Sequence, residues 1–291
     1  MIKPVRFGYN GQTAATNPFM SREADTVAHR EILKQFNNVV TVLRSIGIKV
    51  IVVKDTPYPA TPDSIFPNNF LSTHSDGHTV LFPMCAPNRR DERKPAVLEA
   101  VSNACPGNTL VDLSYWENEG KFLEGTGSMV LDRVHRIAYA SLSPRTSREV
   151  LEDFCNRLGY KPITFHSVDG SGIPIYHTNV MMSVCSDFAV LCSEALFSHD
   201  ELAAVKSSLR QSDKKIVEVS LSQMFRYACN MLELNDGKGN RYVAMSDTAK
   251  NALTDTQMID ISEFGTIVSA DVHTIEAIGG GSVRCMLAEM Y

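Results

Sequence analysis

The sequence lacks the features that mark membrane, secreted and nucleic-acid-binding proteins. It has no run of 18 or more apolar residues, so no membrane-spanning helix is expected. Its first ten residues, MIKPVRFGYN, lack the apolar stretch of a secretory signal peptide. The net charge of −5 shows no excess of basic residues of the kind that binds nucleic acid. We therefore expect a cytoplasmic protein with neither a membrane nor a nucleic acid as partner.

Paired cysteines are also missing, although the chain contains seven cysteines. None of them forms a CxxC pair, their number is odd, and they are scattered over residues 85 to 285. A chain of 291 residues does not need disulfides to build a stable core. The spacing predicts reduced thiols and argues against a zinc site.

The hydrophobic patterns that are present alternate between helices and strands. Helical spacing is clear over residues 25–46, 146–159 and 199–211, and short apolar runs predict strands at 48–53, 78–83, 161–168, 215–220, 241–246 and 265–270. Residues 128–132 and 136–140 resemble a hairpin. No charged linker or Gly/Ser hinge divides the chain. We expect one α/β domain over residues 1–291.

The C-terminal stretch GGGSVRCMLAEMY raises the first candidate for chemistry. Gly279, Gly280 and Gly281 allow positive φ angles or a close approach to a ligand, and Arg284 adjoins Cys285. Backbone N–H groups and positive charge favour a thiolate. A buried structural cysteine is the alternative, and it is the commoner case. The tail would be well ordered if residues 286–290 formed an inner strand.

Three other stretches hold polar residues at the ends of apolar runs. His177 in IYHTNVMM could be a general acid or base, or a structural histidine. Glu124 in KFLEGTGSMVL could orient a substrate or a histidine, or form a loop salt bridge. Asn68 and Asn69 in SIFPNNFLSTH could line a pocket or serve as turn residues.

Together these stretches resemble the guanidino-group-modifying enzymes, which include arginine deiminases, dimethylarginine hydrolases and amidinotransferases. The resemblance is strongest to the amidinotransferase-like hydrolases of citrulline utilisation. The motifs that carry it are FPNN…STH, GTGSMVLDR, HTNVMM and GGGS-x-RCMLAE. The resemblance implies a pentein fold, a five-fold pseudo-symmetric α/β propeller with a central active site. The recurring helix–strand units are compatible with it.

The resemblance also implies a mechanism. Cys285 would be the nucleophile, His177 the general acid and base, and Glu124 a hydrogen-bond partner of the planar substrate group. The reaction would hydrolyse a non-peptide C–N bond through a covalent S-linked intermediate, without a metal or organic cofactor. Under this reading Cys285 lies within a few ångströms of His177.

Further positions resemble the substrate-binding residues of arginine deiminases. Arg89 and Arg145 would grip an α-carboxylate, Asp63 an α-ammonium, and Gly280 would allow a close approach of the main chain. For Arg89 the alternative is a solvated charge run over residues 89–93.

The sequence departs from arginine deiminases at two carboxylate positions, which are Asn69 and Asn179 here. Carboxylates complement a guanidinium, whereas an amide can donate and accept hydrogen bonds. We therefore expect a neutral ureido substrate, with citrulline as first candidate. Amidino transfer to an amine, or a non-catalytic binding propeller, are the alternative functions. The sequence is compatible with a homo-oligomer but does not indicate one.

Overall fold

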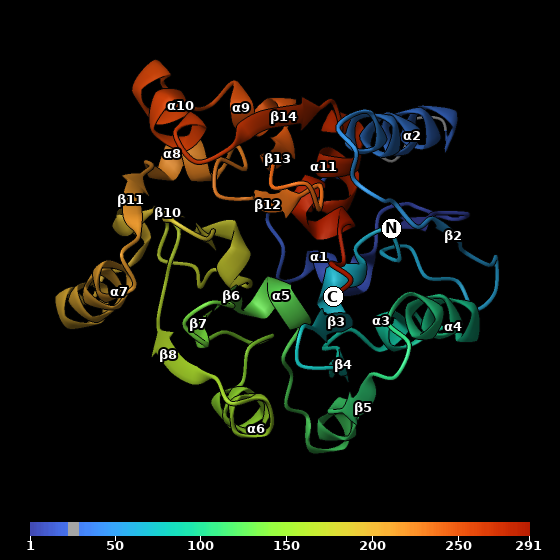
Figure 1. The fold of residues 1–291 in the computed structure, drawn as a ribbon. Coiled ribbons are helices and arrows are strands. Elements are labelled where there is room, and N and C mark those ends of the chain that lie inside the picture. Colours follow the sequence, from blue (N-terminus) through green and yellow to red (C-terminus); the bar gives the residue numbers. More distant parts are fainter. Residues whose placement is uncertain (23–28) are drawn as a thin grey trace.

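Five small β-sheets carry the strands of this chain (Figure 1). The computed structural model describes residues 1–22 and 29–291. One sheet pairs β1 (Ile2–Lys3) with β2 (Val53–Lys54). The other four sheets have three strands each. Their strands are β3 (Leu71–His74), β4 (His78–Leu81), β5 (Thr109–Asp112), β6 (Val130–Asp132), β7 (Ile137–Ser141), β8 (Lys161–Phe165), β9 (Met182–Val184), β10 (Phe188–Leu191), β11 (Lys215–Glu218), β12 (Leu232–Asn235), β13 (Arg241–Ser246) and β14 (Thr266–Ala270).

The four three-stranded sheets share one topology. In each of them the first strand is antiparallel to the second, and the second is parallel to the third. A parallel pair needs a crossover connection, and here helices provide it. The crossover helices are α4 (Pro95–Ala104), α6 (Arg148–Leu158), α7 (His199–Gln211), and α9 (Asp247–Lys250) with α10 (Asp255–Ser262), while α2 (His29–Ser45) connects β1 to β2. The helix–strand units seen in the sequence are therefore topological repeats.

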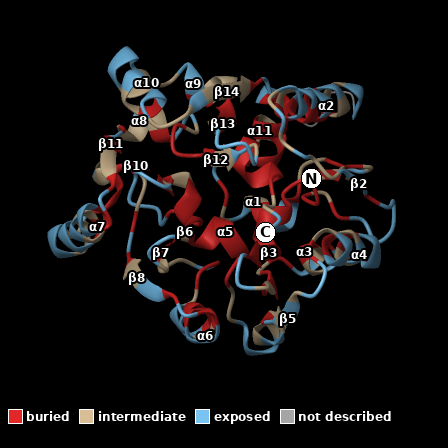
Figure 2. Cartoon of the chain, viewed as in Figure 1, coloured by how far each residue is buried: buried red, intermediate tan, exposed pale blue. Residues whose placement is uncertain are grey.

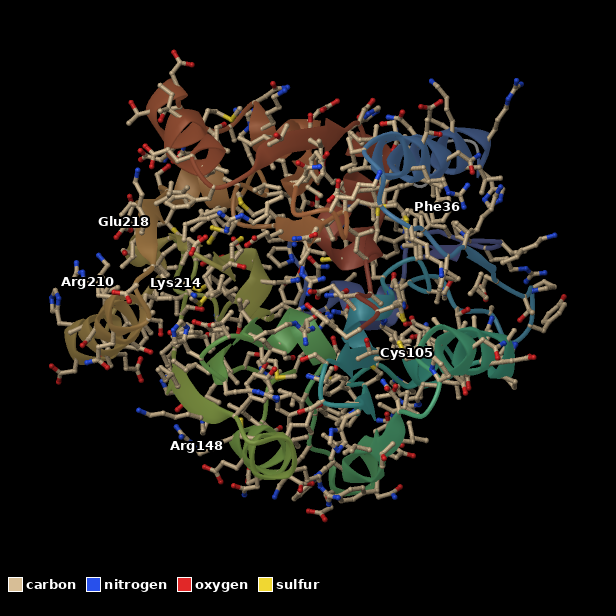
Figure 3. All side chains as sticks on the ribbon, viewed as in Figure 1. Phe36, Cys105, Arg148, Arg210, Lys214 and Glu218 are labelled. Carbon is tan, nitrogen blue, oxygen red and sulfur yellow. The ribbon has the colours of Figure 1, made fainter. Side chains whose placement is uncertain are left out.

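The long helices lie at the periphery and cover the apolar core (Figure 2). In α2 the buried side chains recur at helical spacing, so one face packs inward while the other is solvated. Arg148 of α6 and Arg210 of α7 are exposed at the outer edge of the molecule (Figure 3). Burial of such an apolar stripe is what holds each helix against its sheet.

Short turns gather at the centre of the molecule. They are η2 (Pro67–Asn69), α5 (Gly125–Ser128), η4 (Thr178–Val180) and η6 (Val283–Met286); the first three lead into β3, β6 and β9. α5 contacts both η2 and η4, and η2 contacts η6. A fully or almost fully buried apolar residue anchors each turn, and residues 228–231 before β12 share this feature: Phe70, Met129, Met181, Met231 and Met286. We call these five segments the inner turns; they bring distant parts of the chain together.

The remaining short helices connect these units. They are α1 (Gly11–Ala14), α3 (Pro87–Arg90), η3 (Ser114–Glu119), η5 (Ser193–Ala195), α8 (Leu221–Met224) and α11 (His273–Gly279). Among the described residues, no helix combines the length and apolarity needed to cross a membrane.

Most predicted elements are present with shifted bounds. The helix 199–211, the strand 241–246 and the hairpin of β6 and β7 are confirmed. Gly159 ends α6 with a φ of 67°. The strand predicted at 48–53 is mostly wrong, because only Val53 of that run enters β2. Residues 25–28 of the first predicted helix lie outside the described part.

The inner strand considered for residues 286–290 is also wrong. Met286 ends η6, and residues 287–291 belong to no strand. A side chain satisfies the backbone instead: the Thr73 hydroxyl donates to the carbonyl of Glu289 (2.8 Å) and accepts from the N–H of Tyr291 (3.0 Å). The tail is thus held by side-chain contacts rather than by a strand ladder.

Candidate active site

The inner turns bring the three expected reactive residues to the centre of the fold. Glu124 immediately precedes α5, His177 immediately precedes η4, and Cys285 lies within η6. All three are buried, with exposed fractions of 0%, 4% and 7%. Each comes from a different topological unit, so only the folded chain assembles them.

Glu124 and His177 form a buried pair. His177 Nε2 lies 2.8 Å from Glu124 Oε2, and the other carboxylate oxygen, Oε1, accepts from the backbone N–H of Cys85 at 3.0 Å. Burial works to raise the pKa of Glu124, but Arg145 and His177 outweigh it and hold the pKa well below its usual value. Burial lowers the pKa of His177 to about 4, against the opposing effect of Glu124.

These charge states fix the tautomer of the imidazole. An ionised carboxylate can only accept, so Nε2 of His177 carries the proton that it donates to Glu124. Nδ1 of the neutral ring then holds a free lone pair. A Cβ on Gly127 would lie 2.8 Å from that Nδ1 and 2.4 Å from Asn69 Nδ2. Gly127 is therefore required by space, because any side chain there would collide with both groups.

The sulfur of Cys285 accepts hydrogen bonds from two amides. Asn179 Nδ2 lies 3.5 Å from Sγ and Asn230 Nδ2 lies 3.3 Å from it. The Asn230 carbonyl accepts from the backbone N–H of Arg284 (3.1 Å), which leaves its NH₂ to face the sulfur. Sequence reasoning missed Asn230. The motif ACNML at 228–232 could have identified it, because this motif resembles PNNFL and TNVMM at two other inner turns.

The residues on either side of His177 contact the cysteine segment. The Tyr176 hydroxyl donates to the carbonyl of Gly280 (3.1 Å), and Asn179 reaches the sulfur of Cys285. In the part of the chain that the structure describes, the ring of His177 makes its hydrogen bond with Glu124 and makes none with the sulfur. The expected separation of a few ångströms between His177 and Cys285 stays a prediction.

The three glycines before the cysteine are explained by their neighbours. Gly280 ends α11 with a φ of 63°, where side chains are strained, and a Cβ there would lie 2.5 Å from Asn17. A Cβ on Gly279 or Gly281 would come within 3.0 Å of the Phe66 ring. The groups that lie close to the main chain at these glycines are therefore the side chains of Asn17 and Phe66.

Arg89 lies in a buried ion pair, so the solvated alternative for this residue is wrong. Its Nε and Nη2 reach the two oxygens of Glu92 (2.8 and 2.9 Å), and Nη1 donates to Asn69 Oδ1 (2.9 Å). Burial opposes its charge, but Glu92, Asp63 and Glu124 raise the pKa of Arg89 above its usual value. A guanidinium has no acceptor, so this contact fixes the carbonyl of Asn69 toward Arg89.

Arg145 and Asp63 face the N-terminal segment 10–17, which we call the N-terminal cover. Arg145 donates to the carbonyl of Thr13 (2.6 Å) and the hydroxyl of Thr16 (2.5 Å), and its Nη1 lies 3.4 Å from Glu124. Asp63 Oδ2 accepts from Asn10 (2.8 Å) and Thr13 (2.9 Å). Burial raises the pKa of Asp63, and Arg89 opposes this effect.

Three buried polar atoms in this region have no hydrogen-bond partner within residues 1–22 and 29–291. They are Asp63 Oδ1, Asn68 Oδ1 and Asn69 Nδ2. Buried polar groups are nearly always paired, so these two acceptors and one donor are candidate contacts for a polar ligand. Within residues 1–22 and 29–291, no group of three or more His, Cys, Asp or Glu side chains is placed to hold a metal ion.

Comparisons with known proteins identify the family and the fold. A family model described as N,N dimethylarginine dimethylhydrolase, eukaryotic, matches residues 3–291. No curated protein matches the sequence. The N-terminal domain of ArgZ, in a structure covalently bound to a reaction intermediate, superposes with a TM-score of 0.78 at 16% identity, over 100% of this chain and 96% of that one.

Two further solved structures also superpose over nearly the whole chain. A product-bound N-terminal domain of ArgZ, an arginine dihydrolase of the ornithine–ammonia cycle in cyanobacteria, has a TM-score of 0.76 at 17% identity, over 98% of this chain and 94% of that one. A dimethylarginine dimethylaminohydrolase adduct with S-methyl-L-thiocitrulline has a TM-score of 0.68 at 15% identity, over 98% and 96%. This chain spans only 39% of full-length ArgZ.

These structures share the fold, and the family model spans nearly the whole sequence. The expected membership of the guanidino-group-modifying superfamily is confirmed. The protein belongs to the N,N dimethylarginine dimethylhydrolase family.

Proposed function

We propose that the protein is a cysteine-dependent hydrolase of a C–N bond in a ureido or guanidino group of an arginine-like amino acid. The observation that carries this proposal is the buried Glu124–His177 pair on inner turns that adjoin the amide-bonded sulfur of Cys285. The five small sheets support a single five-unit propeller over residues 1–291. All seven cysteines are unpaired, which suits a reducing cytoplasm.

In the first step Cys285 attacks the central carbon of the substrate group. The neutral ring of His177 accepts the thiol proton at its free nitrogen Nδ1, and the S–C bond forms. His177 then gives that proton to the departing nitrogen as the C–N bond breaks. Glu124 stabilises the transient imidazolium and keeps Nε2 protonated, as its 2.8 Å contact allows.

In the second step one water molecule releases the intermediate. The water oxygen bonds to the carbon, its proton passes to His177, and the S–C bond breaks. The imidazolium returns the proton to the sulfur, so the thiol and the neutral ring are regenerated. Asn179 and Asn230, which donate to Sγ at 3.5 and 3.3 Å, stabilise negative charge on the leaving sulfur.

The unpaired atoms favour a ureido group over a guanidinium. The side-chain carbonyl of Asn69 accepts from Arg89, so its Nδ2 remains as a donor for the substrate. Oδ1 of Asn68 remains as an acceptor. A ureido group has both a carbonyl acceptor and N–H donors, whereas a guanidinium has donors only. Citrulline is therefore the first candidate substrate, although fold alone does not set the substrate.

We assign the amino-acid end of the substrate to Asp63 and Arg145. The free oxygen of Asp63 can accept from an α-ammonium, and Arg145 can exchange its contacts with the N-terminal cover for an α-carboxylate. Gly280 lets Asn17 approach the main chain beside this site, because a Cβ there would lie 2.5 Å from the Asn17 side chain. Four hydrogen bonds already engage the Arg89 guanidinium, so we assign Arg89 to positioning Asn69 rather than to a direct grip.

A substrate panel tests the proposal. Citrulline, arginine, agmatine and methylated arginines would be compared for release of ammonia, ornithine and methylamines, with glycine present in a parallel set as amine acceptor. The expected result is fastest turnover of citrulline without a new guanidino product. Fast arginine hydrolysis with no citrulline turnover would refute the ureido assignment, and a guanidino-glycine product would indicate amidino transfer.

A further inference from the structure

A second space lies next to the inner turns. It is a cavity of about 710 Å³, and its lining includes Thr126 of α5, Asn179 of η4, Ser183 of β9 and Arg284 of η6. Cys285, His177 and Glu124 do not line it. The inner turns therefore separate the reactive residues from this cavity, which we call the rear chamber.

The wall between the chamber and the nucleophile is one side chain thick. Asn179 lines the chamber, and its Nδ2 donates to the sulfur of Cys285 at 3.5 Å. Arg284, the residue before Cys285, also lines the chamber. Asn230, the second amide on the sulfur, does not. Asn179 is thus the side chain that contacts both the chamber and the sulfur of Cys285.

The chamber wall holds an unpaired hydroxyl. Ser183 is 5% exposed, and its Oγ has no hydrogen-bond partner among the residues that the structure describes. A buried hydroxyl of this kind is normally satisfied, and water is the partner that a roomy polar site supplies. Exposed residues such as Lys49, Ser186 and Asn235 also line the chamber, so it is continuous with solvent.

The opposite side of the site is covered. The N-terminal cover hydrogen-bonds to Arg145 and Asp63, and both are buried. A substrate in place there would occupy the free atoms of Asp63, Asn68 and Asn69. Hydrolysis still consumes one water for every S–C bond that breaks, and that water must reach the carbon while the substrate remains bound.

We propose that the rear chamber supplies the hydrolytic water to the Cys285 intermediate and passes ammonia outward, with Asn179 as the dividing side chain. This inference rests on the proposed function. In the second step, the oxygen of the chamber water bonds to the carbon and one of its protons passes to His177. The S–C bond breaks, and the sulfur then receives that proton from His177. No other reactant is needed.

Filling the chamber tests the inference. Ser183→Phe would occupy the space, whereas Ser207→Phe adds the same ring on the exposed side of α7 and leaves the space open. For Ser183→Phe we expect the adduct on Cys285 to form within about twofold of the wild-type rate while steady-state turnover falls about tenfold or more, because only its breakdown needs the chamber. Intact mass after acid quench would show the adduct accumulating. Ser207→Phe should keep turnover near the wild-type rate.

A second variant tests the inference if Ser183→Phe does not fold. Val184→Trp narrows the same chamber from a half-buried lining position. If folded Ser183→Phe or Val184→Trp turns over like the wild type without accumulating adduct, the chamber is not the water route. If the wild type itself forms no adduct and turns over no substrate in the panel, the proposed function fails instead, and the two failures are distinct.

Discussion

His177 Nε2 lies 2.8 Å from Glu124 Oε2, and this pair is sealed from solvent. The two residues are 53 positions apart and reach each other because α5, which lies at the centre of the molecule (Figure 1), contacts η4. The pair defines which nitrogen of the imidazole can take a proton. Several expectations for activity depend on it.

Replacing Glu124 by Gln should disable the base while leaving the fold intact. The isosteric amide lacks the charge that stabilises the imidazolium and fixes the tautomer. We expect kcat/KM to fall by about 10²–10⁴-fold, the range for a lost general base. Glu119→Gln, at an exposed carboxylate, is the matched control and should act like the wild type. Equal activity of both variants would show that the pair is only structural.

Gly127→Ala should abolish most activity for a steric reason. The new methyl would lie 2.4 Å from Asn69 Nδ2 and 2.8 Å from His177 Nδ1, so both groups must move. Displacements of about 1 Å at such groups cost about 10²-fold in rate. Gly170→Ala, at a position with an open environment and ordinary φ, is the control. Steady-state kinetics and a melting curve would separate loss of function from loss of fold; wild-type kinetics for Gly127→Ala would contradict this geometry.

Asn69→Asp should shift the substrate preference toward guanidinium groups. The Arg89 contact is retained, and the unpaired donor becomes a charged acceptor. We expect the ratio of kcat/KM for arginine over citrulline to rise by about tenfold or more, since an added carboxylate attracts a buried cation. Asn103→Asp adds the same charge on an exposed part of α4 and should leave the ratio unchanged. An unchanged ratio for Asn69→Asp would argue that Asn69 does not face the reacting group.

Glu289 should stabilise the fold near neutral pH and lose this effect in acid. Burial opposes its charge, but Arg133 and Arg284 lower its pKa to about 2. The folded pKa lies below the unfolded value, so the stabilisation is present above about pH 4.5 and is lost as the pH falls toward about 2.

Chemical denaturation of Glu289→Gln measures this contribution. At pH 7 the loss should be about 3 kcal/mol, because the pKa falls from 4.5 to about 2 and one unit of pKa shift is worth about 1.4 kcal/mol. Near pH 2 the difference from the wild type should be much smaller. Glu99→Gln, at an exposed position of α4, should change stability little at either pH. A deficit that does not depend on pH would mean that packing, not charge, holds the tail.

The sequence predicted elements well where local pattern alone decides them. The strand at 241–246 and the helix at 199–211 have continuous periodicity and clear ends. β5 gave no such signal, because Thr109, Leu110 and Asp112 of this four-residue strand are exposed. Four of residues 48–52 are apolar, yet none of the five lies in a strand, which no local pattern reveals.

For the site, the candidate reactive residues were proposed from sequence motifs and from the family resemblance, whereas their hydrogen-bond partners depend on long-range packing. Arg89 was expected to grip an α-carboxylate, with a solvated charge run as the alternative, and it is buried against Glu92 and Asn69. Asn230 comes from the fourth three-stranded unit and touches Cys285 across 55 residues. The N-terminal cover hydrogen-bonds to Arg145 across more than a hundred residues. Such contacts follow from the arrangement of the units, and only for Asn230 does the local sequence, ACNML at 228–232, give a signal.

The account depends most on Cys285 being the nucleophile of a site that holds a planar C–N group. Labelling with a haloacetamidine, followed by peptide mapping, tests this directly among seven cysteines. We predict one label per chain, on Cys285, that is prevented by citrulline and absent from Cys285→Ser. Labelling that persists at equal stoichiometry in Cys285→Ser, or that falls on half-buried Cys85 instead, would contradict the account.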